Sequence, residues 1–312
     1  MGFFSAKCTS LARLDGKTAI ITGCNTGIGK CTVQDFFSRG GRVVMACRNL
    51  EKANEAAESI KEDCKNKENL GEIVVTELDL SSFKSIRNCA RRLLSTEKRI
   101  DVLVNNAGVM MCPETKTEDG FELQFGTNHL GHFLLTLLLL PKICQSTPAR
   151  IVNVSSTGHT GCKMDFNDLN WETRKYSSFQ AYKQSKLANV LFTKELARRL
   201  KENNITGVNV YSLHPGVIKT ELGRHVRLSI PWGLHWLLNT MSLFMKTPEQ
   251  GAQTTIYCAV DEKCANETGL YYAECESKEP SAEAKNEEAA RKLWDVSLKL
   301  VGLEDNFFNL QK

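Results

Sequence analysis

"TGCNTGIGK", residues 22–30, follows a short apolar run and opens a helical pattern. Gly23, Gly27 and Gly29 give the spacing G-x-x-x-G-x-G within it. Glycines at such positions permit a tight strand-to-helix turn and let the backbone approach the pyrophosphate of a dinucleotide at the helix N-terminus. A strand before and a helix after favour this interpretation over a purely structural glycine-rich turn.

Beyond this turn, short β-branched runs alternate with longer helical patterns. Such alternation predicts βαβ units, and therefore a parallel sheet with helices on both faces. The strands are nearly continuous apolar runs, as expected where both faces are covered. The sequence thus predicts one doubly wound α/β domain, a Rossmann fold. The predicted strands are "KTAIIT" (17–22), "RVVMAC" (42–47), "EIVVTELDL" (72–80), "IDVLVNNAG" (100–108), "ARIVNVSS" (149–156) and "GVNVYSLHPG" (207–216).

The end of the second predicted strand distinguishes between the two nicotinamide cofactors. A NAD site usually has Asp or Glu there, about twenty residues after the glycine-rich turn, to hold the ribose hydroxyls. This chain has "ACRN", with Arg48 and no carboxylate. A guanidinium suits a 2′-phosphate, so NADP(H) is predicted. The alternative for Arg48 is a surface arginine without a ligand.

Composition excludes several other classes of function. With 42% hydrophobic and 24% charged residues, the chain is typical of a soluble globular protein. A net charge of +4 with scattered basic residues argues against a nucleic-acid partner. The twelve cysteines show no C-x-x-C spacing and no secretory signal opens the chain. They are interpreted as reduced intracellular thiols, which also argues against a zinc site.

"FQAYKQSKLANVLF", residues 179–192, places Tyr182 and Lys186 four positions apart. Residues at this spacing share a helix face, so the lysine charge can lie beside the phenol. A free tyrosine has a pKa of about 10, and a nearby cation favours the phenolate. The spacing alone also fits a polar stripe on an ordinary helix.

Taken together, these features give a sequence that resembles the short-chain dehydrogenases/reductases from about residue 15 to the C-terminus. Within that family it is most similar to the retinol dehydrogenases. The motifs that carry the resemblance, in the family's order, are "TGCNTGIG", "LDL" with Asp79, "NNAG" (105–108), "NHLGHF" with Asn128, "IVNVSS", "YKQSK" and "HPGVIKT".

The resemblance implies a role for each of four catalytic residues. Tyr182 would donate a proton in carbonyl reduction and accept one in alcohol oxidation. Lys186 would hold the nicotinamide ribose and lower the pKa of the tyrosine. Ser156 would position the substrate oxygen, and Asn128 would anchor a water that links Lys186 to solvent. In this architecture Ser156 and Tyr182 both fall at the carboxyl-end crevice of the sheet.

The cofactor-binding residues are expected at the glycine-rich turn, at the ends of the following strands and around "HPG", which would border the nicotinamide. They are Gly23, Asn25, Thr26, Gly27, Ile28, Gly29, Arg48, Asp79, Leu80, Asn106, Ala107, Gly108, Tyr182, Lys186, Pro215, Gly216, Val217 and Thr220.

Two segments depart from the βαβ rhythm. Residues 1–14 are predicted as an N-terminal tail before the enzyme domain, residues 15–312. Residues 223–247 form an apolar insertion, interpreted either as a packed helix or as a substrate lid that contacts a membrane. The longest apolar run is too short to span a bilayer. The expected location is therefore the cytoplasm, with peripheral association at the endoplasmic reticulum membrane as the alternative.

Further expectations concern histidines and assembly. His129, His132 and His159 match no metal-site spacing and are interpreted as packing or surface residues. A homodimer through the apolar helix (130–143) and the helix with Tyr182 is a hypothesis drawn from the family.

The predicted function is an NADP(H)-dependent oxidoreductase that interconverts a lipophilic alcohol and its carbonyl, with retinol and retinal as the first choice. The same chemistry on a steroid, an isoprenoid or a lipid aldehyde is the nearest alternative. A catalytically silent, cofactor-bound regulator is another. A nucleotide-sugar epimerase also uses Tyr-x-x-x-Lys, but normally has a larger C-terminal substrate domain.

Overall fold

The computed structural model describes residues 5–218 and 245–305. Its strands span Thr18–Thr22 (β1), Arg42–Cys47 (β2), Glu72–Glu77 (β3), Val102–Asn105 (β4), Ala149–Val154 (β5), Val208–His214 (β6), Leu270–Ala273 (β7) and Glu276–Lys278 (β8). Within the described residues they form one sheet in the order β3-β2-β1-β4-β5-β6-β7-β8. All neighbours pair in parallel except β7 and β8, which are antiparallel. The predicted doubly wound parallel sheet is confirmed.

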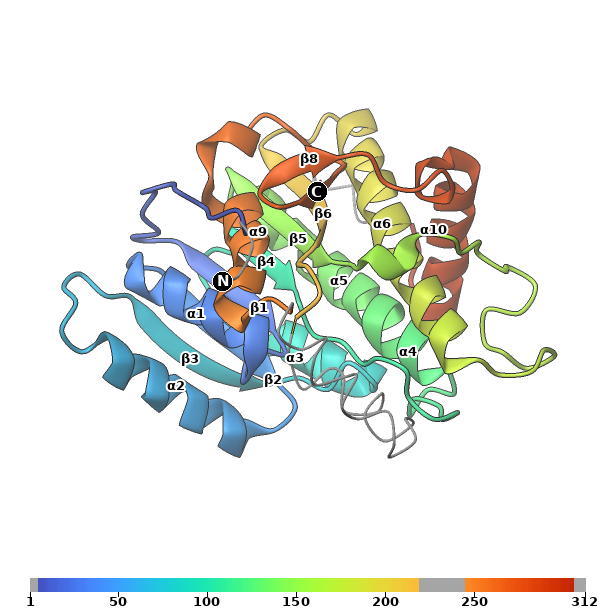
Figure 1. The fold of residues 1–312 in the computed structure, drawn as a ribbon, viewed down its shortest axis with the longest axis horizontal. Helices are drawn as coiled ribbons and strands as arrows, with labels where there is room; N and C mark the ends of the chain where they lie inside the picture. The colour runs from blue at the N-terminus through green and yellow to red at the C-terminus, as the bar shows by residue number, and fades with distance from the viewer. Residues whose placement is uncertain (1–4, 219–244, 306–312) are drawn as a thin grey trace.

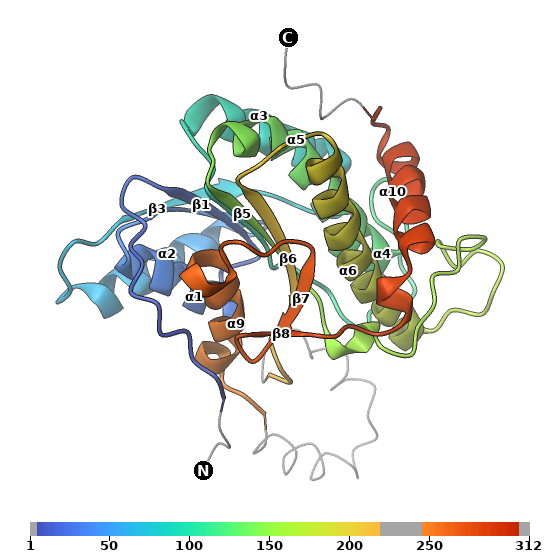
Figure 2. The same ribbon diagram turned by 90° about the horizontal axis from the view of Figure 1, so that it is seen from above.

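Helices cover both faces of the sheet (Figure 1, Figure 2). One face carries α1 (Gly27–Ser38), α2 (Leu50–Cys64) and α9 (Pro248–Val260), and the other carries α3 (Phe83–Thr96), α5 (Gly131–Gln145), α6 (Ser178–Glu202) and α10 (Glu287–Val301). Each face has its own apolar core, with Phe36 and Ile256 in one and Leu134 and Leu191 in the other. The central strands β1, β2, β4, β5 and β6 are buried because both cores cover them, which explains their continuous apolar sequences.

The order of the strands determines where a ligand can bind. From β1 the chain moves outward through β2 and β3, and it then returns to β4 on the other side of β1. In open α/β sheets, ligands bind at the carboxyl ends of the strands where the direction reverses. That point lies between the ends of β1 and β4, which are followed by the glycine-rich turn and by "NNAG".

The apolar helix expected at residues 130–143 is present, and the turns before and at its start depart from regular α-helical geometry. A single turn, α4 (Leu123–Phe125), and a π-helical segment (Gly126–Leu130) come directly before α5. A π-helical segment accommodates an extra residue within a helix and is frequent at functional sites. Asn128 lies at its centre and is fully buried.

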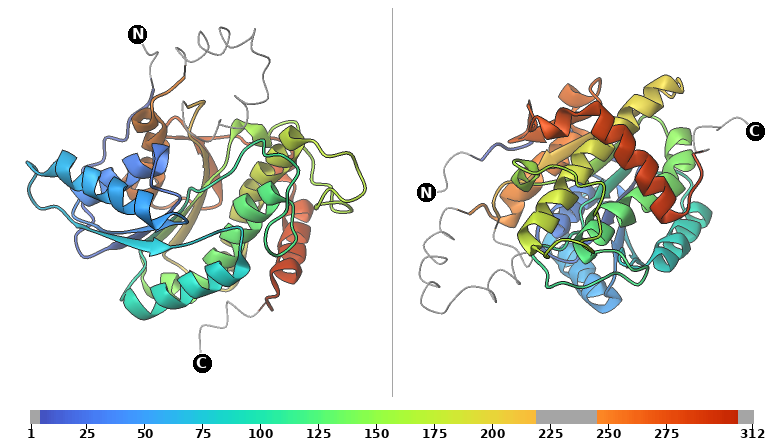
Figure 3. Two further views of the ribbon diagram at one scale, coloured as in Figure 1. Left: turned by 90° about the horizontal axis from the view of Figure 1, so that it is seen from below. Right: turned by 90° about the vertical axis from the view of Figure 1, so that its right-hand side faces the viewer.

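Helix α10 covers one face of α6, the helix that carries Tyr182 (Figure 3). Trp294 of α10 is buried and stacks edge-on against Phe133 of α5, with ring centroids 5.2 Å apart. Arg199 of α6 lies over the Trp294 ring and also pairs with Asp295. A homodimer through this face of α6 would therefore require α10 to move.

The segment before β1 packs onto the domain. The Cys8 backbone N–H donates to Gln253 on α9, and Leu14 is buried beside α1. The predicted apolar insertion (223–247) lies almost entirely outside the described residues. No helix in residues 5–218 and 245–305 has both the length and the apolar character needed to cross a bilayer.

Short 3-10 turns complete the described structure, at Thr157–His159, Glu262–Cys264 and Glu283–Lys285. Cys24, Cys89 and Cys258 are buried free thiols, as expected for small apolar side chains.

Candidate active site

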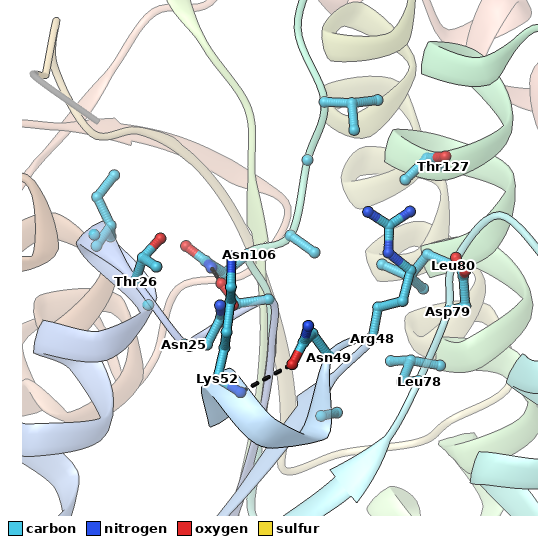
Figure 4. Close-up of a pocket in the computed structure, with 18 residues that line it drawn as sticks. Asn25, Thr26, Arg48, Asn49, Lys52, Leu78, Asp79, Leu80, Asn106 and Thr127 are labelled. Atoms are coloured by element: carbon cyan, nitrogen blue, oxygen red, sulfur yellow. Dashed lines mark hydrogen bonds between the residues drawn. The ribbon is translucent and has the colours of Figure 1, made fainter. Parts of the chain in front are cut away.

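A cavity of about 620 Å³ opens at the carboxyl ends of β1, β2 and β4 (Figure 4). Its volume lies within the range of cofactor and ligand sites. Its described wall consists of Gly23, Asn25, Thr26, Gly27, Ile28, Gly29, Ala46, Arg48, Asn49, Lys52, Leu78, Asp79, Leu80, Asn106, Ala107, Gly108, Val109 and Thr127.

Two glycines of the turn are explained by close approach to "NNAG". Gly23 has φ +60°, and a Cβ there would lie 2.6 Å from the Ala107 Cβ. A Cβ on Gly29 would lie 2.7 Å from Asn106 Nδ2. That amide nitrogen donates to the carbonyls of Thr22 and Gly23 and so joins the two loops. Larger residues would separate the loops that form the cavity wall.

The N-terminus of α1 points its positive end at this cavity. Thr26, the N-cap, makes no side-chain cap bond, and the first turn of α1 contains no acidic residue. Backbone N–H groups at a helix start, together with the helix dipole, favour an anion. This end of the cavity therefore suits the pyrophosphate of a dinucleotide.

Two exposed cations extend into the cavity, Arg48 from the end of β2 and Lys52 from the first turn of α2 (Figure 4). Asp79 is the acidic residue of the described wall, and its Oδ1 accepts from the backbone and hydroxyl of Ser81. Lys30 lies outside the wall, because its Nζ donates to Ser59 on α2. The residues at the end of β2 thus favour a ligand with additional negative charge.

Ser156 and Tyr182 lie close together at the carboxyl end of β5. Ser156 follows β5, and its Oγ accepts from the Gly158 N–H at 3.0 Å. A Cβ on Gly158 would lie 3.2 Å from the Tyr182 ring and 3.4 Å from Ser156 Oγ, so the two side chains border the same space. Burial raises the pKa of Tyr182, and a hydrogen bond from Ser156 partly opposes this effect.

Lys186 lies on the same side of α6 as Tyr182. Its Nζ is 5.8 Å from the centroid of the Tyr182 ring and donates to the Val154 carbonyl at 3.1 Å. A Cβ on Gly108 would lie 3.6 Å from this Nζ. Because Gly108 lines the cavity, the ammonium lies directly behind the cavity wall. Burial lowers the pKa of Lys186 to about 8.

The expected lowering of the tyrosine pKa by Lys186 is not seen in this structure. The net change for Tyr182 is upward, because the phenol is almost completely buried and desolvation disfavours the phenolate. The protein alone therefore holds Tyr182 as a neutral phenol at neutral pH.

Asn128 holds the "NNAG" loop and α6 together. Its Oδ1 accepts from the Val109 N–H at 2.8 Å, and its Nδ2 donates to the Val109 carbonyl and to Ser185 Oγ, each at 2.9 Å. Ser185 Oγ in turn donates to the Tyr182 carbonyl. The four residues predicted as catalytic are thus brought together beside the cavity, although they come from three separate segments of the sequence.

Twelve of the predicted cofactor-binding residues line the cavity, from Gly23 to Gly108. Tyr182, Lys186, Pro215, Gly216 and Val217 are not part of the described wall, and Thr220 lies outside the described residues.

The strand end after β6 nevertheless lies near the glycine-rich turn. A Cβ on Gly251 would touch both Ile218 and Ile28, at 2.1 and 3.2 Å. Because Ile28 belongs to the cavity wall, the segment that begins at Pro215 lies beside one end of the cavity.

Several residues of the site were missed in the sequence. Ala46, Asn49, Lys52, Leu78, Val109 and Thr127 also line the cavity. Lys52 had a usable signal, because it is a cation in the first turn of the helix that follows Arg48 and β2. The three histidines interpreted as packing or surface residues are all buried, and His159 bonds to the Ser156 carbonyl through Nδ1 at 2.7 Å. No periodicity in the sequence indicated that bond.

Comparison with known proteins agrees with this geometry. Residues 17–230 match the short chain dehydrogenase family. The chain is 50% identical over 304 residues to retinol dehydrogenase 13 of Homo sapiens, covering 95% of this chain and 88% of that protein. It is 48% identical over 299 residues to human retinol dehydrogenase 11, covering 96% and 90%. A solved structure of an uncharacterized Mycobacterium paratuberculosis protein has a TM-score of 0.76 at 33% identity, covering 97% of this chain and 99% of that one.

The family match covers most of the chain, and the relatives are aligned over nearly their whole length. The fold, the glycine-rich turn at the reversal of strand order and the Ser, Tyr and Lys side chains beside it agree with that match. The chain belongs to the short-chain dehydrogenase/reductase family and is an NAD(P)-dependent oxidoreductase of alcohols and carbonyl compounds.

Proposed function

We propose that this enzyme uses NADP(H) to interconvert a lipophilic alcohol and its carbonyl, with retinol and retinal as the substrate pair and Tyr182 as the acid and base. The observation that carries the proposal is the placement of Ser156, Tyr182, Lys186 and Asn128 beside a cavity with Arg48 and Lys52 in its wall. Similarity to two proteins named retinol dehydrogenase supports the choice of substrate.

The cavity residues fit the proposed cofactor. The N-terminus of α1 would hold the pyrophosphate, Asp79 and Leu80 would contact the adenine side, and Arg48 with Lys52 would hold the 2′-phosphate. When bound, the nicotinamide supplies or accepts the hydride and, when oxidised, adds a positive charge that favours the tyrosine phenolate.

The protein's own residues donate and accept the proton that the substrate oxygen gains or loses. Because Ser156 Oγ accepts from Gly158 N–H, its hydroxyl proton is available to the substrate oxygen or to Tyr182. The raised pKa of Tyr182 keeps it protonated at neutral pH, so it is ready to protonate the carbonyl oxygen during reduction. Among the described residues, Lys186 Nζ bonds to the Val154 carbonyl, and its further donors suit ribose hydroxyls.

A Tyr182→Phe variant tests the proposal. It should bind NADPH as the wild type does, while the kcat for retinal reduction falls by roughly 100-fold or more. Tyr211→Phe is the matched control, since Tyr211 is also buried but its hydroxyl donates to the Cys264 carbonyl. Turnover retained in Tyr182→Phe would exclude Tyr182 as the acid.

The substrate is tested separately with a panel of retinal, a steroid ketone, an isoprenoid aldehyde and a short lipid aldehyde, each with NADPH and with NADH. We expect the highest kcat/KM for retinal with NADPH. A higher value for another aldehyde would assign that compound class instead, and turnover of none would favour the silent regulator.

Peripheral contact with the endoplasmic reticulum membrane is part of the same proposal, since a lipophilic substrate partitions into lipid. Sedimentation with liposomes of endoplasmic reticulum lipid composition measures it. Protein that stays in the supernatant with every lipid mixture would contradict that contact.

A further inference from the structure

His132 lies one helical turn after Asn128, at the start of α5, and has no role in the chemistry described above. Its side chain is buried. Nδ1 is 3.0 Å from the Asn128 carbonyl oxygen, and Nε2 is 2.9 Å from Thr22 Oγ1. The imidazole therefore joins the end of β1 to the π-helical segment.

The hydrogen bonds that join Thr22, His132 and Asn128 allow one assignment of donors and acceptors. A carbonyl oxygen accepts only, so Nδ1 must carry the proton that it donates to Asn128. Thr22 Oγ1 already accepts from the N–H groups of Asn106 and Ala107, both at 3.0 Å. Its own proton is thus the donor to Nε2, because the alternative acceptor, the Val104 carbonyl, is 3.5 Å away.

The surroundings keep this imidazole neutral. Burial lowers the pKa of His132 to about 4, and the nearby charge of Lys186 acts in the same direction. A neutral ring with the proton on Nδ1 can donate at one end and accept at the other, as the two contacts require.

The two residues joined by His132 belong to different parts of the site. Thr22 receives the first two N–H groups of the loop that forms the cavity wall. Asn128 lies beside Lys186, since a Cβ on Gly108 would be 3.3 Å from Asn128 Oδ1 and 3.6 Å from Lys186 Nζ. A displacement of Asn128 would change both the cavity wall at Val109 and the surroundings of the ammonium.

We propose that His132 is a positioning residue for the reaction: its neutral imidazole fixes the Asn128 carbonyl relative to Thr22, and so sets Asn128 and Lys186 relative to the cofactor cavity. This inference rests on the proposed function, in which Lys186 and Tyr182 act on the cofactor and substrate. It assigns the catalytic effect of His132 to its Nδ1 donor.

Two variants of His132 test its two hydrogen bonds separately, since each variant keeps one of them. In His132→Asn the amide nitrogen replaces Nδ1 and keeps the donor to Asn128. In His132→Gln the longer amide places its oxygen near the former Nε2, which keeps the contact with Thr22 and loses the one with Asn128. We expect His132→Asn to keep kcat within about 3-fold, and His132→Gln to lower it roughly 10- to 100-fold with little change in the KM for retinal.

The pH profile gives a readout that simple loss of packing would not change. A displaced Asn128 admits water to Lys186, so the alkaline limb of kcat/KM should move to higher pH in His132→Gln and remain in place in His132→Asn. His129→Gln is the matched control, because His129 is equally buried but bonds to Ser297 on α10 at 2.8 Å. It should lower the melting temperature without moving the limb.

Equal kcat and equal pH limbs in the two His132 variants, with Tyr182→Phe inactive, would overturn the positioning role and leave the proposed function intact. Nitrogen-15 NMR of wild-type His132 tests the inference without turnover and without any risk of misfolding. We expect the Nδ1–H tautomer and no titration between pH 5.5 and 9. An Nε2–H tautomer, or protonation near the ordinary histidine pKa of about 6.5, would overturn it.

Discussion

At the scale of single residues, the proposed preference for NADP(H) rests on the end of β2. Arg48 stands where a NAD-binding chain would have a carboxylate, and Lys52 adds a second cation to the cavity wall. A carboxylate at this point would repel a 2′-phosphate and accept hydrogen bonds from ribose hydroxyls.

Arg48→Glu should therefore weaken NADPH binding by roughly 10- to 100-fold, the value of a lost charge-assisted hydrogen bond, while NADH binding improves. Fluorescence titration with both nucleotides measures the change. Lys30→Gln is the control, because Lys30 bonds to Ser59 outside the cavity wall. If Arg48→Glu left the preference unchanged, Arg48 would be a surface residue.

The buried ammonium of Lys186 predicts the pH dependence. Burial lowers its pKa to about 8, so its positive charge is lost as the pH rises through that value. Tyr182, with a raised pKa, remains protonated over the same range. The kcat/KM for retinal reduction should be flat between pH 6 and 7.5 and should fall above pH 8. A Lys186→Arg variant that retains activity should lose this fall, and a wild-type profile that rises above pH 8 would contradict the assignment.

The lowered pKa of Lys186 also predicts how the stability of the fold changes with pH. The folded-state pKa of Lys186 lies below its ordinary value of 10.5, so the buried charge destabilises the fold at pH 8 and below. That cost disappears between pH 8 and 10.5, as the lysine becomes neutral in the folded state first. The buried charge of Lys186 therefore lowers the stability of the fold at neutral pH.

At the scale of elements, α10 packs on the half of the molecule that carries Tyr182 and Lys186, the residues proposed to be catalytic. It packs on α6 through Trp294, beside Phe133 and Phe192, and it bonds to the π-helical segment through Ser297 and His129. Loss of this helix would expose the apolar side of α6.

Trp294→Ala should lower the free energy of unfolding by about 3–5 kcal/mol, because it leaves a large cavity between α10 and α5. Urea denaturation followed by circular dichroism measures it. Phe179→Ala on α6 is the control, since Phe179 is 51% exposed and should cost about 0.5 kcal/mol or less. Similar costs for both variants would show that α10 contributes little.

At the scale of the whole molecule, cofactor binding and folding are linked. The cavity wall combines the turn after β1, the start of α2 and the loop after β4, so a bound dinucleotide joins segments that are separate in an unfolded chain. A ligand that binds only the folded state stabilises it by mass action.

NADPH at 100 times its Kd should therefore add about 2.7 kcal/mol to the free energy of unfolding and raise the melting temperature. NADH at the same concentration should raise it less. Differential scanning fluorimetry measures both, and Arg48→Glu should remove the difference. A larger effect of NADH would contradict the proposed preference for NADP(H).

Much of the fold can be predicted from the amino-acid sequence alone. The positions of β1 to β6 and of the glycine-rich turn follow from local patterns, because strand and helix periodicities and turn glycines depend on neighbours in sequence. The positive φ of Gly23 and the place of Arg48 at the end of β2 could be predicted for the same reason, whereas the close approach of Gly23 to Ala107 could not.

Other features depend on contacts between segments that are distant in sequence, so no local pattern predicts them. The π-helical segment around Asn128, the cover of α6 by α10 and the bonds of His132 to Thr22 and Asn128 are of this kind. The upward shift of the Tyr182 pKa is another, because burial is a property of the packed core. Spacing placed the lysine near the phenol, but desolvation, which only packing creates, sets the sign of the shift.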